Sequence, residues 1–228
     1  MPSKRFQAAK ALIEKKKIYP ITDAIALLKK TAGAKFNETV EVHFRLGIDP
    51  AKSDQQVRGT VALPHGTGKT KKVAAFVEAE KAAIATAAGA DIVGAEDLIA
   101  EISKTNAIDF DVAVATPAMM PKLAKLAKLL GPRGLMPNPK TDTVGPNIEK
   151  IIKEQKAGKI SFKNDTTSNI HTIFGRASFE EAQLVANLNA VIEAVRKGKP
   201  STSKGVYMRT VTICTAMGPG IKVEVAIV

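Results

Sequence analysis

The residues best suited to chemistry lie between positions 63 and 72, where the sequence reads LPHGTGKTKK. The GKT triplet at 68–70 matches the end of a phosphate-binding loop, in which backbone N–H groups surround phosphates, lysine contacts the terminal ones and a hydroxyl coordinates Mg²⁺. A complete loop also has a glycine at the position of Leu63 and a helix that begins at the lysine. Residues 71–77 read instead as a strand. The motif is therefore incomplete.

The same segment also reads as a crossover between two domains. Pro64, Gly66 and Gly68 favour a loop, because glycine supplies backbone dihedrals that other residues avoid. We favour this interpretation and take Gly66 and Gly68 as hinge residues. Hydrolysis of a nucleotide with Lys69 is the competing, enzymatic hypothesis.

The chain has three histidines and one cysteine. His43, His65 and His171 are scattered and have no Cys, Asp or Glu at metal-ligand spacing, so we predict no metal site. His43 stands beside Arg45 on the polar side of a predicted strand, where it either contacts phosphate or is simply exposed. Cys214 has no disulfide partner in the chain and is predicted to be a small buried group. No Ser/His/Asp set or close carboxylate pair stands out, so we predict no catalytic residue and no cofactor.

A glycine-rich turn, TAMGPG at 215–220, separates the last two predicted strands. Glycine lets RNA sugars and phosphates approach the backbone, and the apolar Met217 can pack on a ribose or a base. The alternative is a plain hairpin with a buried methionine. The sequence alone favours neither.

Two further segments draw notice between positions 121 and 140. Lys122, Lys125 and Lys128 recur opposite a leucine stripe, which is typical of a solvated helix face and also fits a face that follows an RNA backbone. The loop GPRGLMPNPK at 131–140 is too rich in proline and glycine for a plain connector.

The overall charge indicates the class of partner. The chain has 34 Lys and Arg against 22 Asp and Glu, a net charge of +12 and a pI near 9.7. Such an excess favours nucleic acid phosphates or anionic membranes. Because no apolar run is long enough to span a bilayer and no secretory signal or lipidation motif is evident, we predict a cytoplasmic protein that binds nucleic acid rather than membranes.

The N-terminal part predicts two helices and two strands. The first helix covers residues 3–17, with three lysines at its end. Its apolar face is predicted to contain Phe6, Ala9, Leu12 and Ile13. Thr22 is expected to cap the second helix. Residues 40–46 alternate apolar and polar side chains, which predicts a strand with one exposed face, and residues 58–63 form another strand.

The middle of the chain alternates short apolar runs with helical stretches. The predicted strands are 73–77, 91–93 and 112–115. The predicted helices are 79–88, 95–103, a leucine-rich stretch around 123–130, and a stretch with Ile148, Ile151 and Ile152 that is closed by Gly158. Units of this length predict a parallel sheet with helices on its faces.

After Gly158 the pattern becomes antiparallel. Residues 159–163 and 170–174 read as strands joined by a polar turn. Ser178 and Glu181 form a capping-box pattern before a long helix. The buried stripe of this helix is predicted to contain Val185, Leu188, Ile192 and Val195. Strands at 206–215 and 221–227 follow.

Charge separates the same three regions. Residues 1–67 carry a net charge of +6, residues 68–158 of +2 and residues 159–228 of +4. We therefore predict two α/β domains. The first is a split α+β domain of residues 1–67 and 159–228, with an antiparallel sheet and helices, and the second is an inserted, doubly wound Rossmann-like domain of residues 68–158.

Together these segments resemble the large-subunit ribosomal protein L-one family of bacterial type over nearly the whole chain. The most specific are KFNETVEV at 35–42, LGIDP at 46–50 and SDQQVRG at 53–59. Further matches, in the same order, are LPHGTGK at 63–69, LGPRGLMPNPKT at 130–141, KG at 204–205 and MGP at 217–219.

The resemblance implies a basic terminal domain that binds large-subunit ribosomal RNA at the mobile side stalk of the ribosome. It also implies a hinge near Gly66, Gly68 and Gly158. Beyond RNA binding, it implies help in the release of deacylated tRNA from the exit site and repression of translation by binding of the protein's own operon mRNA. The protein is expected to be ribosome-bound, and monomeric when free.

The resemblance also implies a set of RNA contacts, made through backbone groups, hydroxyls and 2′-OH groups. They are Phe36, Thr39, His43, Arg45, Lys163, Asn164, Thr210, Thr215, Met217 and Gly218. Two residues depart from the family pattern: Ala216 replaces a threonine, and Asp142 stands where glycine is usual. One lost neutral hydrogen bond at Ala216 is worth about 0.5–1.5 kcal/mol, which trims affinity without abolishing binding. A non-specific basic RNA chaperone is the third hypothesis, and it predicts no dependence on Met217.

Overall fold

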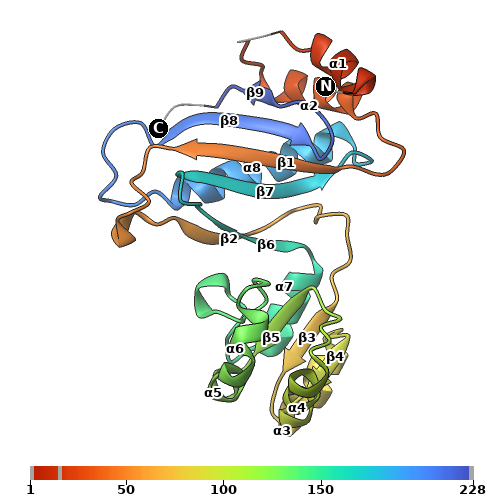
Figure 1. The fold of residues 1–228 in the computed structure, drawn as a ribbon, viewed down its shortest axis with the longest axis vertical. Helices are drawn as coiled ribbons and strands as arrows, with labels where there is room; N and C mark the ends of the chain where they lie inside the picture. The colour runs from red at the N-terminus through yellow and green to blue at the C-terminus, as the bar shows by residue number, and fades with distance from the viewer. Residues whose placement is uncertain (1–2, 15–16, 226–228) are drawn as a thin grey trace. The chain divides into compact units, whose positions relative to one another are not determined.

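The computed structural model describes residues 3–14 and 17–225. The chain divides into two compact units, Met1–Gly68 with Ile160–Val228, and Lys69–Lys159 (Figure 1). The first unit combines both ends of the chain, and the second is one continuous segment. The predicted fold class is confirmed, because one unit contains an antiparallel sheet and the other a parallel sheet.

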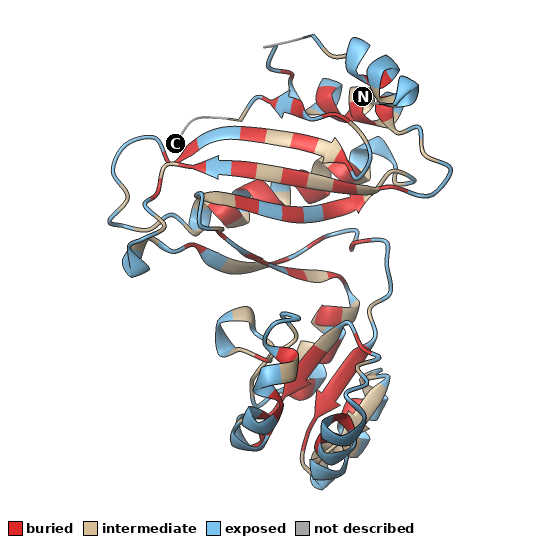
Figure 2. Ribbon diagram, in the orientation of Figure 1, coloured by how far each residue is buried: buried red, intermediate tan, exposed pale blue. Residues whose placement is uncertain are grey.

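The first unit is built on a four-stranded antiparallel sheet. Its strands, in spatial order, are β7 (Asn169–Arg176), β1 (Thr39–Leu46), β8 (Met208–Thr215) and β9 (Ile221–Val223). Burial alternates along β1 as its sequence predicts, with Val40, Val42 and Phe44 buried and the side chains between them partly or fully exposed (Figure 2). One face of the sheet is therefore apolar, and the other is polar.

Two helices, α2 (Ile21–Thr31) and α8 (Glu181–Lys197), pack against the sheet and share one apolar core with it. The short helix α1 (Lys4–Ala11) packs on α2. A separate two-stranded sheet pairs β2 (Arg58–Ala62) with β6 (Lys159–Lys163), and β2 packs against α8. A single 3-10 turn, η1 (Ser53–Gln55), precedes β2.

The second unit has a three-stranded parallel sheet covered on both faces. Its strand order is β4 (Ile92–Gly94), β3 (Val73–Phe76) and β5 (Val112–Ala115). Ala74 and Phe76 face a core that includes α4 (Glu96–Thr105), whereas Val73 and Ala75 face a second core with α3 (Ala79–Ala87) and α7 (Ile148–Lys156). Burial on both faces explains why β3 and β5 read as continuous apolar runs.

The leucine-rich stretch is not the single helix that we predicted. It consists of η2 (Pro117–Met119), α5 (Met120–Leu123), η3 (Ala124–Leu126) and α6 (Ala127–Leu130), and a further 3-10 turn, η4 (Pro139–Thr141), follows in the loop. Leu123, Leu126 and Leu130 are nevertheless fully buried. A 3-10 turn has three residues per turn, so leucines spaced by three stay on one side there.

The first two helices differ from the prediction at their ends. Helix α1 stops at Ala11, and Leu12, predicted on its apolar face, is 53% exposed. Of the three lysines expected at its end, Lys15 and Lys16 lie outside the described residues. Helix α2 begins after Pro20 with no side-chain cap, so the prediction for Thr22 is wrong. Proline needs no hydrogen bond for its nitrogen, which makes it a suitable residue at a helix start.

The capping box of α8 lies two residues later than predicted. Glu180 is the N-cap, and its side chain and that of Gln183 bond each other's backbone N–H groups. Ser178 is engaged elsewhere, because Nδ2 of Asn37 donates to its hydroxyl at 2.9 Å and its own N–H donates to Oδ1 of Asn37 at 3.2 Å. In the predicted stripe Val185 is only half-buried, and the helix buries Asn187 instead.

Strand pairing after Gly158 also differs from the prediction. β6 and β7 are joined by one isolated bridge, Asn164 to Ile170, while β6 pairs with β2 and β7 pairs with β1. The strand expected at 206–215 begins at Met208, and the last one, expected at 221–227, ends at Val223. Residues 226–227 of that prediction lie outside the described part of the chain.

Tyr207, just before β8, is fully buried and its hydroxyl donates to the carbonyl of Val195 at 3.1 Å. Burial raises the pKa of Tyr207 to about 12. Its contribution to stability is therefore complete below about pH 10, where the unfolded side chain ionises, and is lost as the pH rises toward 12.

We expect Tyr207→Phe to lower the free energy of unfolding by about 1 kcal/mol at neutral pH, because one buried hydrogen bond is lost. Above about pH 10 the stability of the wild type should fall more steeply than that of the variant. Urea unfolding followed by circular dichroism at several pH values measures both slopes. Parallel slopes for the two proteins would show that the buried hydroxyl does not titrate in this way.

Candidate nucleic-acid interface

The outer face of the first unit's sheet carries polar and basic side chains from β1, β7 and β8. Strand register sets them in rows: Arg45 lies opposite Thr210, and His43 lies between Thr212 and His171. Arg45 and Thr210 are exposed and His43 is partly exposed. The register thus brings three of the expected contact residues onto one face.

The glycine-rich turn lies at one end of this face, beside the start of β1. The N–H of Ala216 donates to the carbonyl of Thr39 at 2.9 Å. Met217 is 52% exposed, and Phe36, three residues before Thr39, is 58% exposed. The alternative of a hairpin with a buried methionine is therefore wrong. Exposed apolar side chains beside accessible backbone suit packing against ribose or bases.

The turn is held by a residue that the sequence did not single out as a site residue. Glu38 is 2% exposed, and its two carboxylate oxygens accept hydrogen bonds from different segments. Oε1 accepts from the N–H of Ala34 at 2.8 Å, and Oε2 accepts from the N–H of Met217 at 3.1 Å. Glu38 therefore fixes the turn to the loop that precedes β1. Its place within the KFNETVEV segment was the signal that could have found it.

The carboxylate of Glu38 is charged in spite of its burial. Burial opposes ionisation, but the hydroxyl of Thr215, the N–H groups of Ala34 and Met217 and the charge of Arg5 together hold its pKa below the usual value. The Thr215 hydroxyl lies close enough to favour the charged form, although it makes no well-aligned hydrogen bond. Hydrogen bonds to an ionised acceptor are stronger than those between neutral groups, so Glu38 holds the turn strongly.

Two expected contact residues do not present their side chains to solvent. Thr215 is 1% exposed and Asn164 is 6% exposed. Oδ1 of Asn164 accepts from the N–H of Val57 at 2.8 Å, and Nδ2 donates to the carbonyl of Asp165 at 3.0 Å. Their burial does not fit the expectation of direct side-chain contacts and indicates that they shape the loops around the face. Lys163, the neighbour of Asn164, is exposed.

The three glycines expected at the hinge adopt left-handed backbone conformations. Gly66, Gly68 and Gly158 have φ values of +65°, +73° and +99°. At Gly68 a Cβ would lie 2.8 Å from Cγ of Arg176 and 2.9 Å from the ring of Phe179, so both space and dihedral require glycine. The dihedral reasoning from the sequence is confirmed at Gly66 and Gly68.

The first crossover segment is anchored by Asn187, a fully buried residue on α8. Its Oδ1 accepts from the N–H of His65 at 3.0 Å. Its Nδ2 donates to the carbonyls of Gly66 at 3.0 Å and Phe174 at 2.9 Å. One amide therefore satisfies three backbone groups, a role that no sequence pattern around residue 187 predicted.

The GKT triplet does not form a phosphate-binding loop. Nζ of Lys69 lies 3.1 Å from Oδ1 of Asp111, and Oδ2 of the same carboxylate accepts from the N–H of Lys72. The next element is strand β3, not a helix, so no helix N-terminus faces this lysine. Asp111, directly before strand β5, thus has a structural role, because it bonds both Lys69 and Lys72.

The remaining motifs of the second unit have structural partners. Lys122, Lys125 and Lys128 are exposed, and Lys122 forms an ion pair with Glu96. Asp142, which stands in place of a glycine, has a φ of +50°. Its carboxylate lies 2.9 Å from Nζ of Lys159.

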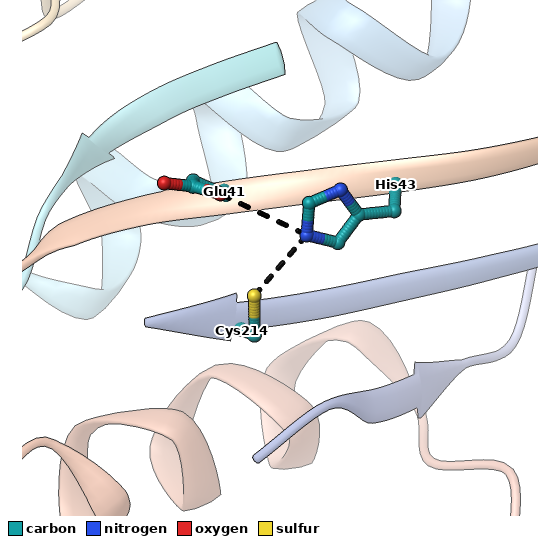
Figure 3. Close-up of side chains that lie close together, drawn as sticks. All are labelled: Glu41, His43 and Cys214. Carbon is teal, nitrogen blue, oxygen red and sulfur yellow. Dashed lines mark hydrogen bonds and ion pairs between the residues drawn. The ribbon is translucent and has the colours of Figure 1, made fainter. Parts of the chain in front are cut away.

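The prediction that the histidines are scattered, with no cysteine or acidic residue nearby, is wrong for His43 and His171. Nδ1 of His43 lies 2.8 Å from Nδ1 of His171. Nε2 of His43 lies 3.2 Å from Sγ of Cys214 (Figure 3). Glu41 joins them, with its carboxylate 3.9 Å from His43 Nε2. Neighbouring strands bring these residues together across large sequence separations. Within the described residues, His65 does not belong to this group.

The environment sets the protonation of this cluster. Burial, and then the neighbouring His171, lower the pKa of His43 against the smaller effect of Glu41, so the imidazole is neutral at pH 7. Burial and the charge of Glu41 raise the pKa of Cys214 to about 11. Cys214 is only half-buried, whereas we predicted a small buried group.

Comparison with known proteins shows which class of protein this chain resembles. Residues 28–219 match the Ribosomal protein L1p/L10e family. Large ribosomal subunit protein uL1 of Saccharopolyspora erythraea is 53% identical over 222 residues, which cover 97% of this chain and 93% of that protein. The proteins of the same name from Corynebacterium aurimucosum and Salinispora tropica are each 51% identical, over 99% and 97% of this chain and 96% and 93% of theirs.

These similarities place the chain among ribosomal proteins and not among enzymes. It belongs to the ribosomal protein L1p/L10e family. The resemblance read from its motifs is therefore confirmed, and the hypothesis of nucleotide hydrolysis with Lys69 is wrong. Across the part of the chain that the structure describes, no helix is long and apolar enough to cross a membrane.

Proposed function

We propose that the chain is a structural constituent of the large ribosomal subunit that binds large-subunit ribosomal RNA through its first unit. The relatives that match this chain over nearly their full length are named large ribosomal subunit protein uL1. The observation that carries the RNA-binding surface is the exposed turn at Met217, anchored by the buried carboxylate of Glu38. The basic terminal regions and the row containing Arg45 and Thr210 support the same surface.

In this proposal, the exposure of each side chain determines how it contributes to RNA binding. Phe36 and Met217 offer apolar surface for ribose or base, and Gly218 leaves the backbone accessible. Thr39, His43 and Thr210 offer polar groups, whereas Arg45 and Lys163 offer charges to phosphates. Asn164 and Thr215 act indirectly, because they are buried. Ala216 is exposed and contributes no hydroxyl.

The finer parts of the proposal concern the ribosome in action. We propose that the bound protein belongs to the mobile side stalk, that it assists release of deacylated tRNA from the exit site, and that it represses translation of its own operon mRNA by binding a similar RNA structure. The left-handed glycines Gly66, Gly68 and Gly158 are proposed as the hinge between the units. The free protein is proposed to be a monomer.

Binding of a large-subunit RNA fragment tests this proposal. We expect submicromolar affinity that falls steeply with salt, because phosphate contacts release counterions. Met217→Ala should weaken specific binding by about 1–3 kcal/mol if its side chain packs on the RNA. Ile84→Ala is the matched control, since Ile84 is 49% exposed but lies in the second unit; it should bind like the wild type.

An unrelated RNA of equal length separates the remaining alternatives. The specific proposal requires at least about a tenfold preference for the ribosomal fragment at moderate salt. Equal affinity for both RNAs, together with no effect of Met217→Ala, would establish the non-specific RNA chaperone instead. Co-sedimentation with large ribosomal subunits tests the assignment to the subunit independently.

A further inference from the structure

Three side chains with different metal-binding atoms meet on the outer face of the antiparallel sheet, where β1 lies beside β8 (Figure 3). They are Glu41, His43 and Cys214, and their ligand atoms all lie within 4.8 Å of one another. Glu41 and Cys214 are register partners across the two strands, and His43 is two residues further along β1. The backbone pairing itself therefore holds the three together.

The distances suit a zinc-like ion. A tetrahedral Zn²⁺ with bonds of about 2.0 Å to nitrogen and oxygen and about 2.3 Å to sulfur places nitrogen and sulfur about 3.5 Å apart, and nitrogen and oxygen about 3.3 Å apart. Nε2 of His43 lies 3.2 Å from Sγ of Cys214 and 3.9 Å from Oε2 of Glu41. Side-chain rotations that shift the ligand atoms by about half an ångström bring both separations to these values, and the Glu41 side chain is 36% exposed.

A second layer of contacts orients the imidazole. Nδ1 of His43 lies 2.8 Å from Nδ1 of His171, and Nε2 of His171 lies 3.5 Å from Oδ2 of Asp165. With the His171 proton on Nε2, facing the carboxylate, its Nδ1 accepts the Nδ1–H of His43. Nε2 of His43 then has a free lone pair directed at Cys214. Metal-binding histidines characteristically donate their other N–H to such a partner.

We propose that Glu41, His43 and Cys214 form a binding site for a divalent cation of the zinc type, with its fourth position open to water. On binding, a metal–sulfur bond forms at Cys214 while the thiol proton leaves to solvent, and no oxidant or reductant is required. Thiolate and imidazole ligands select Zn²⁺ or Co²⁺ over Mg²⁺ and Ca²⁺, which prefer oxygen ligands.

Cobalt titration of the full-length, reduced protein tests the site. The chain has one cysteine, so a thiolate-to-cobalt charge-transfer band can arise only from Cys214. We expect one equivalent of Co²⁺ to produce this band and one equivalent of Zn²⁺ to remove it. A protein that shows no thiolate band at saturating Co²⁺ does not have the proposed site.

Variants assign the ligands. Cys214→Ala should abolish the band, and Glu41→Ala and His43→Ala should each weaken Zn²⁺ binding by at least about tenfold in competition with a chromophoric chelator. His171→Gln should weaken Zn²⁺ binding by about 10–100-fold, although His171 does not coordinate the ion. His65→Ala removes an exposed histidine elsewhere in the unit and should leave affinity unchanged. Equal Zn²⁺ affinity for wild type and Cys214→Ala would refute the assignment.

Protection of the thiol gives a test that needs no variant. Cys214 is partly accessible, so it should react with a disulfide reagent such as dithiobis(nitrobenzoate). One equivalent of Zn²⁺ should slow this reaction at least about tenfold, because a metal-bound thiolate is masked. Unchanged reactivity would count against the site even if the variants failed to fold. Neither measurement involves RNA, so the result is independent of the proposed function.

Discussion

Replacing Asn187 with alanine should lower the free energy of unfolding by about 3–5 kcal/mol, because three buried backbone groups lose their hydrogen-bond partner at once. The N–H of His65 and the carbonyls of Gly66 and Phe174 all bond this single amide. Water cannot replace it well, since Asn187 is fully buried. The loss should also release the segment around His65 and Gly66, near the end of the first unit's N-terminal part.

Urea unfolding followed by tyrosine fluorescence measures this effect in the relevant unit. The chain has no tryptophan, and both tyrosines, Tyr19 and Tyr207, belong to the first unit. The matched control is Asn189→Ala, two residues further along the same helix on its exposed side. It should change stability by less than about 0.5 kcal/mol. Similar losses of unfolding free energy in both variants would mean that the buried hydrogen bonds of Asn187 do not account for the effect.

The second large effect is expected at Glu38. Glu38→Ala should lower the free energy of unfolding by about 3–4 kcal/mol at pH 7, because the N–H groups of Ala34 and Met217 each lose a charged acceptor. The variant should also weaken RNA binding, although the buried side chain itself cannot contact RNA. The reason is that the turn at Met217 loses its hydrogen bond to Glu38 and is no longer held in the position that suits RNA contact.

The pH dependence identifies the charge of Glu38 as the cause. Its pKa is lowered in the folded protein, so its contribution is present above the unfolded value of about 4.3 and is lost as the pH falls through the folded value. The stability difference between wild type and Glu38→Gln should therefore shrink from about pH 6 to about pH 3. Glu193→Gln, at an exposed carboxylate on α8, is the control for the removal of one negative charge. A constant difference across this range would assign the effect to packing instead of charge.

The proposed metal site and the proposed RNA surface share one side chain. His43 is a ligand in the first and a polar contact in the second, and it lies in the row that also contains Thr212 and His171. If both proposals hold, the ion and RNA compete for this imidazole. Measuring RNA affinity with and without Zn²⁺ would show how strongly the two are linked.

The sequence by itself determined most of the elements, the fold class and the family. The alternation of 40–46, the continuous apolar runs at 73–77 and 112–115, and the unusual dihedrals of Gly66 and Gly68 were predicted correctly, because burial periodicity and dihedral preference are local properties. The motifs from 35 to 219 identified the family for a similar reason, since each is a short contiguous segment.

Tertiary structure alone decided which side chains meet. Glu38 reaches Met217 across 179 positions, Asn187 reaches His65 across 122, and His43 reaches Cys214 across 171. Such contacts depend on strand register and on how helices pack on the sheet, and a local pattern contains no information about either. For the same reason the pairing of β6 with β2 escaped prediction. The sequence names the residues able to act, but only the packing of distant segments makes them neighbours.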